Sequence, residues 1–409
     1  MVMKNFLYKF IGLQMLILST LLTATTAQAD DLDNQDRIIS MLYHRETAEP
    51  LLKEGLKQFE QESGYKVNLV FVNVNDLKQI LIKGAVNNSL PDVVLAPSDF
   101  VSLATMIKLS KLPPALLNPD LTPEALRSMR YQGDYYGAPV ISGNHLMLFY
   151  NKKYVKNPAK NWRELKAQAP QLRAQGIEPI GWNYPEMYWF SSFATTLGGA
   201  PLTDGAPSLN SQAYIDALSF YKELADSGLI KPTCGYDCAQ KDFQEQLFAY
   251  AINGDWALAD FEHYLGKDLG ITVIPAIGDK PFRPLFSTVG LLFPGNSLQG
   301  KKAKSLAALA LFFQSRRFQD TLFEKQRFLP ANQHSFEQVE ATANSNIKML
   351  LKQLAQAVPM QPDPIMANAW IGMRKGFERY MAGISSAKEA AEYMQKFTER
   401  DYQKSQLSQ

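Results

Sequence analysis

Apolar and polar positions in the first third of the chain alternate between strand-like runs and helix-like stripes. Short apolar runs over 37–42, 67–72 and 92–96 predict three strands. Between the runs, apolar residues recur every three or four positions, as at Leu52 and Leu56, which predicts helices. The order strand, helix, strand, helix, strand within about sixty residues is typical of a parallel, doubly wound sheet.

Polar side chains follow the first and third of these predicted strands. His44, Arg45 and Glu46 come directly after the first, and Ser98 and Asp99 follow the third. In an open parallel sheet the ligand crevice lies outside the carboxyl ends of the strands. We therefore expect Arg45, Glu46 and Asp99 to lie near a ligand.

A second alternation of the same kind begins near residue 146. The strands that it predicts are 146–150, 177–182, 248–252 and 271–274. Asp255 follows the predicted strand 248–252 and is expected to cap a helix. The chain from about Lys301 onward is helical in pattern, and Ser386 and Glu389 form a capping box for the final helix. Because no Pro/Gly/Ser-rich linker separates the two α/β units, we expect the chain to cross between them more than once.

Residues 1–29 have the three zones of an export signal. Lys4 and Lys9 supply the positive charge, 10–22 is mostly apolar, and Ala27 and Ala29 give the small-x-small pattern that signal peptidase accepts. The apolar run is too short and too interrupted for a stable membrane span, although a retained anchor is the alternative. We expect an exported mature protein that begins near residue 30.

The two cysteines, Cys234 and Cys238, are separated by three residues. Redox and zinc motifs place two residues between their thiols, so this spacing does not match them. In an oxidising compartment a local disulfide is favoured, and a redox role is the weaker alternative. A loop this short is stabilised only modestly by the bond, so its role should be local.

Composition narrows the chemistry further. The 409 residues include 42 Lys and Arg against 40 Asp and Glu, so charge gives no argument for nucleic acid or an anionic membrane. Four His argue against a multi-ligand metal site, and we expect no cofactor. The chain has no G-x-S-x-G, H-E-x-x-H, P-loop or G-x-G-x-x-G motif. Paired carboxylates have no fixed sequence signature, so an exported carbohydrate-active enzyme stays an alternative.

Tryptophans at predicted strand-to-helix junctions point to a stacking site. Trp189 closes a segment that also holds Tyr184 and Glu186, Trp256 follows an Asn-Gly pair, and Trp370 lies near the start of a C-terminal helix. A large ring at such a junction can stack on the apolar face of a sugar while polar neighbours bind its hydroxyls. Packing in the core is the alternative for each ring.

Seven segments, in order along nearly the whole mature chain, resemble one known family. They are 52–72, 92–99, 131–151, 251–257, 271–275, 287–290 and 367–374. The resemblance is to the maltose/maltodextrin-binding proteins, the substrate-binding subunits of bacterial ABC sugar importers. It implies a two-lobed periplasmic-binding-protein fold of α/β class, with a doubly wound, mostly parallel sheet flanked by helices in each lobe. Sugar would bind between the lobes.

The resemblance also implies where the lobes divide. Three hinge crossings are expected near 142–145, 286–290 and 314–317. The N-terminal lobe would comprise 30–143 plus 290–314. The C-terminal lobe would comprise 144–289 plus 315–409.

Matched residue by residue, the resemblance assigns several binding roles. Trp256 and Trp370 take the positions of the stacking rings, Asp99 that of an acid that binds sugar hydroxyls, and Arg374 follows the second ring. Tyr184 and Glu186 fall in the acid–aromatic patch of the second lobe, and Trp189 adjoins them.

The chain also departs from the maltose-binding pattern. Arg45 stands where the family has an Asp in the first lobe, and Asn144 stands where the family has a Glu in the hinge. Phe100 stands where the family has an Arg, and Ala96 where it has a Trp. An unpaired buried donor or acceptor costs about 1–3 kcal/mol, so such changes alter the preferred sugar. Arg45 would also suit an acidic sugar, because guanidinium binds carboxylate in bidentate fashion.

The partners implied by the resemblance are a sugar or oligosaccharide and an ABC permease of the inner membrane, with a monomeric, periplasmic binding protein. Ligand would drive hinge closure, and no nucleic acid or cofactor is expected. One alternative keeps the same clamp but presents its closed form to a sensor kinase or chemoreceptor. Another keeps the fold and changes the ligand to a polyamine, metal chelate or phosphate ester.

Overall fold

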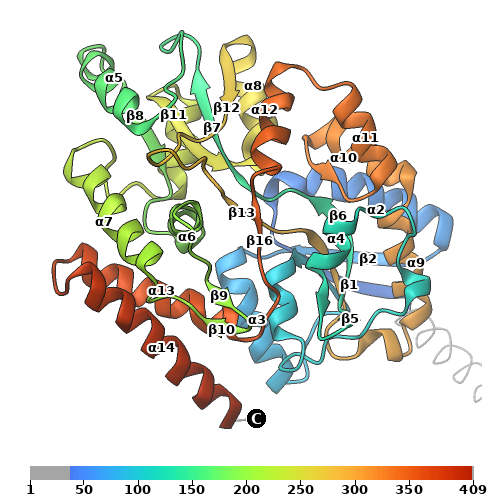
Figure 1. The fold of residues 1–409 in the computed structure, drawn as a ribbon. Coiled ribbons are helices and arrows are strands. Elements are labelled where there is room, and N and C mark those ends of the chain that lie inside the picture. The colour runs from blue at the N-terminus through green and yellow to red at the C-terminus, as the bar shows by residue number, and fades with distance from the viewer. Residues whose placement is uncertain (1–36, 408–409) are drawn as a thin grey trace, which may run out of the picture.

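The computed structural model describes residues 37–407, which form two α/β lobes connected by several chain crossings (Figure 1). The predicted export signal at 1–29 lies outside the described residues. Each lobe is built around one main sheet, and helices from the C-terminal third of the chain contribute to both lobes.

The N-terminal lobe contains a six-stranded sheet of order β15-β6-β14-β3-β1-β2. Its strands are β1 (Ile38–Tyr43), β2 (Lys66–Phe71), β3 (Val93–Pro97), β6 (Gly137–Ser142), β14 (Val289–Leu292) and β15 (Leu329–Pro330). β1 pairs in parallel with β2 and β3, whereas β14 is antiparallel to β3 and β6, and β15 is antiparallel to β6. The sheet is therefore mixed, because strands that return late in the chain enter it in the opposite direction.

Helices cover both faces of this sheet. On one face lie α2 (Glu49–Ser63), α9 (Ala303–Gln314) and α10 (Arg316–Gln326), and on the other lies α3 (Val74–Val86). In β3, Val93 and Leu95 pack in the first of these cores and Val94 and Ala96 in the second. Burial on both sides explains why this strand is a continuous apolar run.

The C-terminal lobe contains a four-stranded mixed sheet of order β12-β7-β11-β8. The strands are β7 (Leu146–Asn151), β8 (Glu178–Trp182), β11 (Phe248–Gly254) and β12 (Leu269–Thr272). Residues of this sheet form one hydrophobic core together with α5 (Trp162–Ala174), α6 (Met187–Thr196), α7 (Gln212–Asp226), α13 (Ile365–Met381) and α14 (Ala387–Leu407). The other is shared with α8 (Leu258–Leu265), α11 (Gln333–Ala341) and α12 (Ser345–Leu354).

Shorter elements complete the chain. They are α4 (Pro123–Ser128), β4 (Arg130–Tyr131), β5 (Asp134–Tyr135), β9 (Leu202–Thr203), β10 (Ala206–Pro207), β13 (Leu285–Phe286) and β16 (Val358–Pro359). β13 and β16 pair with each other in parallel.

The strands and helix ends predicted from the sequence pattern correspond closely to these elements. The seven predicted strands are β1, β2, β3, β7, β8, β11 and β12. Gly64 ends α2 with a left-handed φ of 74°, and its N–H donates to the carbonyl of Glu60. The capping box also forms, since the Ser386 N–H donates to the Glu389 carboxylate at 2.8 Å. The cap predicted at Asp255 is wrong, because Gly254 holds the cap position of that turn.

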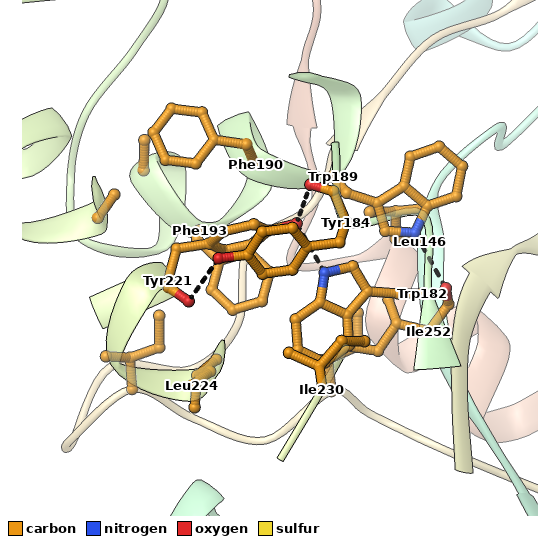
Figure 2. Packing of buried hydrophobic residues seen from close by; sticks show 14 of the residues in the cluster. Leu146, Trp182, Tyr184, Trp189, Phe190, Phe193, Tyr221, Leu224, Ile230 and Ile252 are labelled. Carbon is orange, nitrogen blue, oxygen red and sulfur yellow. Dashed lines mark hydrogen bonds between the residues drawn. The ribbon is translucent and has the colours of Figure 1, made fainter. Parts of the chain in front are cut away.

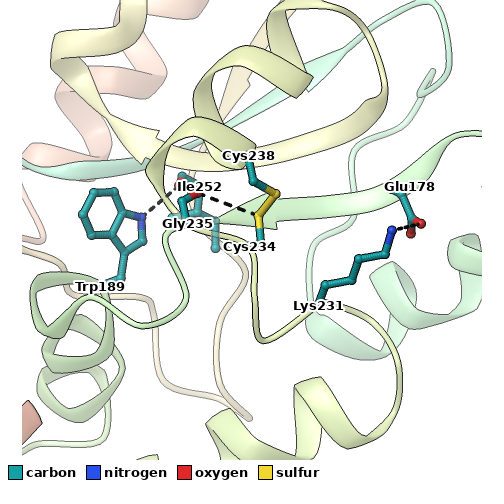
Figure 3. The surroundings of a disulfide bond; sticks show 7 residues. All are labelled: Glu178, Trp189, Lys231, Cys234, Gly235, Cys238 and Ile252. Atoms are coloured by element: carbon teal, nitrogen blue, oxygen red, sulfur yellow. Dashed lines mark hydrogen bonds and ion pairs between the residues drawn. A yellow bond between two sulfur atoms is a disulfide. The ribbon is translucent and has the colours of Figure 1, made fainter. Parts of the chain in front are cut away.

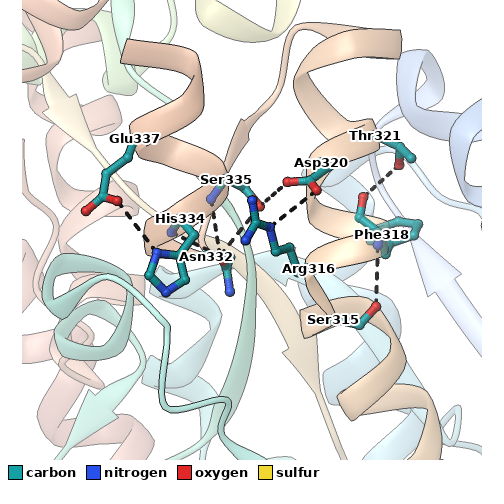
Figure 4. A network of polar contacts seen from close by, with 9 residues as sticks. All are labelled: Ser315, Arg316, Phe318, Asp320, Thr321, Asn332, His334, Ser335 and Glu337. Carbon is teal, nitrogen blue, oxygen red and sulfur yellow. Dashed lines mark hydrogen bonds and ion pairs between the residues drawn. The ribbon is translucent and has the colours of Figure 1, made fainter. Parts of the chain in front are cut away.

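The crossings expected near 142–145 and 286–290 are present, because β6 and β7 belong to different sheets and so do β13 and β14. The third crossing does not lie at 314–317. There, α10 packs against α2 and α9, and β15 then pairs with β6 of the first sheet. The chain reaches the second lobe between β15 and α12, through α11, whose Ser335 hydroxyl donates to Asp320 of α10 at 2.6 Å (Figure 4). The assignment of all of 315–409 to the C-terminal lobe is therefore wrong for residues 315–330, because their sheet and helix partners are in the first lobe.

Candidate functional site

Arg45 lies at the centre of a polar and aromatic cluster where the two lobes meet. Its side chain leaves the loop after β1, is only 7% exposed, and donates a hydrogen bond to Oδ1 of Asn144. The guanidinium carbon lies 5.5 Å from the ring centroid of Trp256 and 5.3 Å from that of Phe328. Its Nε is buried and has no hydrogen-bond partner among the residues that the structure describes. Burial lowers the pKa of the guanidinium, and the charge of Asp255 opposes that change.

Asn144 connects the first crossing to three other parts of the site. Its backbone has a left-handed φ of 47°, directly after Gly143 with a φ of 97°. The Asn144 N–H donates to Oδ2 of Asp255 at 2.9 Å, and its side-chain amide donates to the hydroxyl of Ser287 at 2.6 Å. Since Ser287 belongs to the second crossing, one side chain holds two crossings together and positions Arg45 as well.

Three aromatic rings lie against this polar centre. Tyr188 in α6 has its ring centroid 6.3 Å from that of Trp256 and 6.5 Å from that of Trp370 in α13. Its hydroxyl is hydrogen-bonded to the carbonyl oxygens of Asn144 and Leu285, the latter at 2.9 Å. Burial is the main reason why the pKa of Tyr188 lies well above its ordinary value, and the charges of nearby acids raise it further. The phenol therefore stays a neutral donor.

Two ion pairs flank the cluster. Asp99 lies in the short helical turn after β3, is 7% exposed, and pairs with Lys78 of α3 at 2.7 Å. Arg374 of α13 lies 3.4 Å from Glu186, which caps α6. Helix α13 also contacts the turn that carries Asp99, so residues of the two lobes approach each other here.

The structure brings together most of the residues predicted from the sequence. Arg45, Asn144, Trp256 and Trp370 share one cluster, and the pairs made by Asp99 and by Glu186 with Arg374 lie beside it. Glu46 is exposed, and no hydrogen bond joins its side chain to the cluster. The predicted disulfide between Cys234 and Cys238 is present.

Tyr184 and Trp189 lie in the core of the C-terminal lobe (Figure 2). Tyr184 is 1% exposed, and its hydroxyl donates to the carbonyl of Tyr221. Trp189 is 4% exposed and donates from Nε1 to the carbonyl of Ile252 at 2.9 Å, so it supports Trp256 edge-on from behind. Their predicted ligand roles are therefore wrong, because the segment continues into α6, which turns Tyr188 toward the site instead.

Sequence reasoning missed several members of the site. They are Lys78, Tyr188, Tyr236, Asp255 in its contact with the hinge, and Phe328. If the segment around Trp189 is read as a helix, Tyr188 points about 100° away from Trp189 and becomes a second candidate for the site. Tyr236 stands between the two cysteines, which offered a further signal.

The chemistry of this arrangement favours binding over catalysis. Half-buried indole and phenol rings give flat apolar faces, and guanidinium, amide and carboxylate groups give donors and acceptors around them. No group of three or more His, Cys, Asp or Glu side chains within residues 37–407 could hold a metal ion. None of the helices in that range is long and apolar enough to cross a membrane.

Comparison with known proteins agrees with this chemistry. The chain is 26% identical over 218 residues to the maltotriose-binding protein of Pyrococcus abyssi, covering 52% of this chain and 48% of that protein. It thus spans about half the length of that relative. It is also 24% identical over 374 residues to the maltooligosaccharide ABC transporter solute-binding lipoprotein of Streptococcus pneumoniae, covering 86% and 85% of the two chains.

Among solved structures, the fold is similar to the maltose/maltodextrin-binding domain MalE from Bdellovibrio bacteriovorus bound to maltotriose. The TM-score is 0.83 with 27% sequence identity, over 90% of this chain and 100% of that one. Residues 55–349, well over half of the sequence, match the model of one family. By that match this chain belongs to the bacterial extracellular solute-binding proteins, a family of binding proteins and not of enzymes.

Proposed function

We propose that this protein captures a sugar or oligosaccharide between its two lobes and delivers it to the membrane permease of an ABC importer. The observation that carries the proposal is the cluster of Arg45, Asn144, Tyr188, Trp256 and Trp370 at the junction of the lobes. Its rings and fixed donors match a ligand with flat apolar faces and many hydroxyls. The maltotriose-related titles of the relatives support the same class of ligand.

Ligand entry requires the lobes to separate. Arg45 and Asp99 are each only 7% exposed, and the rings around Arg45 contact one another, so the side chains that would bind sugar are covered by their neighbours. Hinge opening about the crossings at Gly143–Asn144 and Ser287 would uncover them. A ligand then favours the closed arrangement only to the extent that it binds that arrangement more tightly than the open one.

The guanidinium of Arg45 limits the ligand to saccharides that offer it a hydrogen-bond acceptor. Its Nε is a buried donor without a partner, and an unpaired donor of this kind is costly unless a ligand satisfies it. Sugar hydroxyls and sugar carboxylates can both accept from a guanidinium, and a carboxylate does so in bidentate fashion. The screen described below therefore includes both classes.

The protein acts outside the cytoplasm as a monomer, with 1–29 removed as a signal peptide and the mature chain in the periplasm. Support comes from the family, which is extracellular, and from the three zones of the leader. None of the described residues gives a specific reason to prefer a sensor kinase or chemoreceptor as the partner.

A thermal-shift screen tests the proposal. Mono-, oligo- and acidic saccharides, with maltotriose included, are added to the mature protein at millimolar concentration. A ligand that binds only the folded state stabilises it by about 2.7 kcal/mol at one hundred times Kd, which raises the Tm. The matched control is the Arg45→Ala/Trp256→Ala variant, which should lose the shift. A Tm that no saccharide raises contradicts the proposal, and so does release of shortened products during incubation.

A further inference from the structure

The disulfide Cys234–Cys238 closes a short loop whose ends are fixed in the C-terminal lobe (Figure 3). Cys234 is 3% exposed within the core, and its carbonyl accepts from the N–H of Tyr184 at 2.9 Å. Cys238 packs partly buried against the cores on both sides of the sheet and begins a short helical turn. The base of the loop is therefore part of the core.

The tip of this loop reaches the candidate site. Tyr236 lies between the two cysteines, and 39% of its surface is exposed. Its hydroxyl accepts a hydrogen bond from Nε1 of Trp256 at 3.1 Å, and its ring meets that of Trp189 edge-on at 6.4 Å. Burial raises the pKa of the Tyr236 phenol, and the hydrogen bond from Trp256 and the charge of Arg45 oppose that rise. Tyr236 is thus the acceptor for the indole N–H of the ring that Arg45 stacks on.

We propose that the disulfide is a positioning element of the binding site, which holds Tyr236 against the indole edge of Trp256 and so fixes the indole for stacking. This inference deepens the proposed function and rests on it for its ligand-binding consequence. Neither cysteine touches the ligand. Each acts through Tyr236, and Tyr236 acts through the orientation of Trp256.

Two physical arguments support a local role over a global one. The cross-linked residues are four positions apart, so the bond removes less entropy from the unfolded chain than the closure of a long loop would. In contrast, a side chain that is already immobilised loses little conformational entropy when ligand binds. The affinity is higher because that entropic cost is absent. Tyr236 is 39% exposed, so its contacts at the tip are confined to one side, where Trp189 and Trp256 lie.

The loop keeps other anchors when the bond is absent, so a variant without cysteines is expected to fold. Gln240, just after the loop, donates to Asp260 at 3.0 Å and accepts from the side-chain amide of Asn253 at 2.8 Å. The Cys234 N–H donates to the carbonyl of Lys231 at 2.9 Å. These backbone and side-chain bonds do not need sulfur, and they confine the change to the tip.

The first test measures affinity. In the full mature chain, the Cys234→Ala/Cys238→Ala variant is compared with the unsubstituted protein by calorimetric titration with maltotriose, or with whichever saccharide gives the largest thermal shift. We expect binding to weaken by about two- to tenfold, with a fall in Tm of no more than a few degrees. In a Tyr236→Ala background, removing both cysteines should change the affinity by less than twofold, because the residue that they position is gone.

The second test needs no ligand. The indole N–H resonance of Trp256, assigned with a Trp256→Phe variant, should move or broaden when both cysteines are replaced. The indole of Trp189, which meets the Tyr236 ring, is expected to shift as well, while those of Trp162, Trp182 and Trp370 keep their positions. An unchanged Trp256 resonance overturns the inference, and so does equal loss of affinity with and without Tyr236. If no saccharide binds the unsubstituted protein, the proposed function fails, and the indole resonance alone decides the positioning role.

Discussion

Replacing Trp256 with alanine removes the ring on which most contacts of the site converge. The indole is half-buried, lies 5.5 Å from the guanidinium of Arg45, and meets the rings of Tyr188 and Trp189 at 6.3 and 6.0 Å. Its Nε1 donates to Tyr236. Truncation at Cβ deletes all of these contacts while leaving the backbone of the turn after β11 in place.

The magnitude follows from these contacts. Removing a stacking aromatic anchor from a binding site typically costs about 1–3 kcal/mol of binding free energy, which is about a 5- to 150-fold increase in Kd. Because the ring is only half-buried, the free energy of unfolding should fall less than for a fully buried aromatic, by about 1–2 kcal/mol. The protein should therefore remain folded and bind poorly.

Calorimetric titration with the saccharide found in the screen measures the first quantity, and urea unfolding measures the second. Tyr264→Ala is the matched control, since this aromatic ring is 58% exposed on α8 and makes no contact with the cluster. The control should change neither Kd nor stability by much. Unaltered affinity in the Trp256→Ala variant would refute the stacking assignment and with it the placement of the ligand at this cluster.

Three further results are expected. Trp370→Ala should weaken saccharide binding by about 1–3 kcal/mol without unfolding the protein, and titration showing full affinity would remove Trp370 from the site. Gly143→Ala should lower the free energy of unfolding by about 2–4 kcal/mol, because φ is 97° and a Cβ there would clash with the carboxylate of Asp255; urea unfolding with an unchanged midpoint would contradict this. Burial, with the nearby charge of Arg45, lowers the pKa of His44 to about 3, so the folded state resists protonation that the unfolded chain accepts. Stability should therefore be full only well above pH 6.5 and fall by about 2 kcal/mol between pH 7 and pH 5, and this loss should be missing in His44→Gln.

Local periodicity was sufficient to predict most of the elements. The strand at 92–96 and the helix ended by Gly64 depend on neighbours within one or two turns, and both are present as β3 and α2. The disulfide was predictable for the same reason, because its two sulfurs are four positions apart. Trp256 and Trp370 were found partly through the family resemblance, which fixes positions that periodicity leaves ambiguous.

The course of the third crossing was not predictable in this way. β15 contains only Leu329 and Pro330, too short for a pattern, and its partner β6 lies almost two hundred positions earlier. Pairing between such distant segments depends on the packing of α10 against α2, which no local window contains. Residues 315–330 therefore join the first lobe, although the sequence pattern continues without a break.

The same division holds within the site. The sequence by itself determined that aromatic and polar residues follow the strands, and it identified Arg45 and Asn144 as departures with consequences. Only the tertiary structure decided that Arg45 and Asn144, 99 positions apart in the chain, are joined by a hydrogen bond. It also decided that α6 buries Trp189 and turns Tyr188 toward Trp256. The physical reason is that a residue's type and spacing set the interactions it is capable of making, whereas the direction of its side chain depends on which distant segment packs against the other face of its helix.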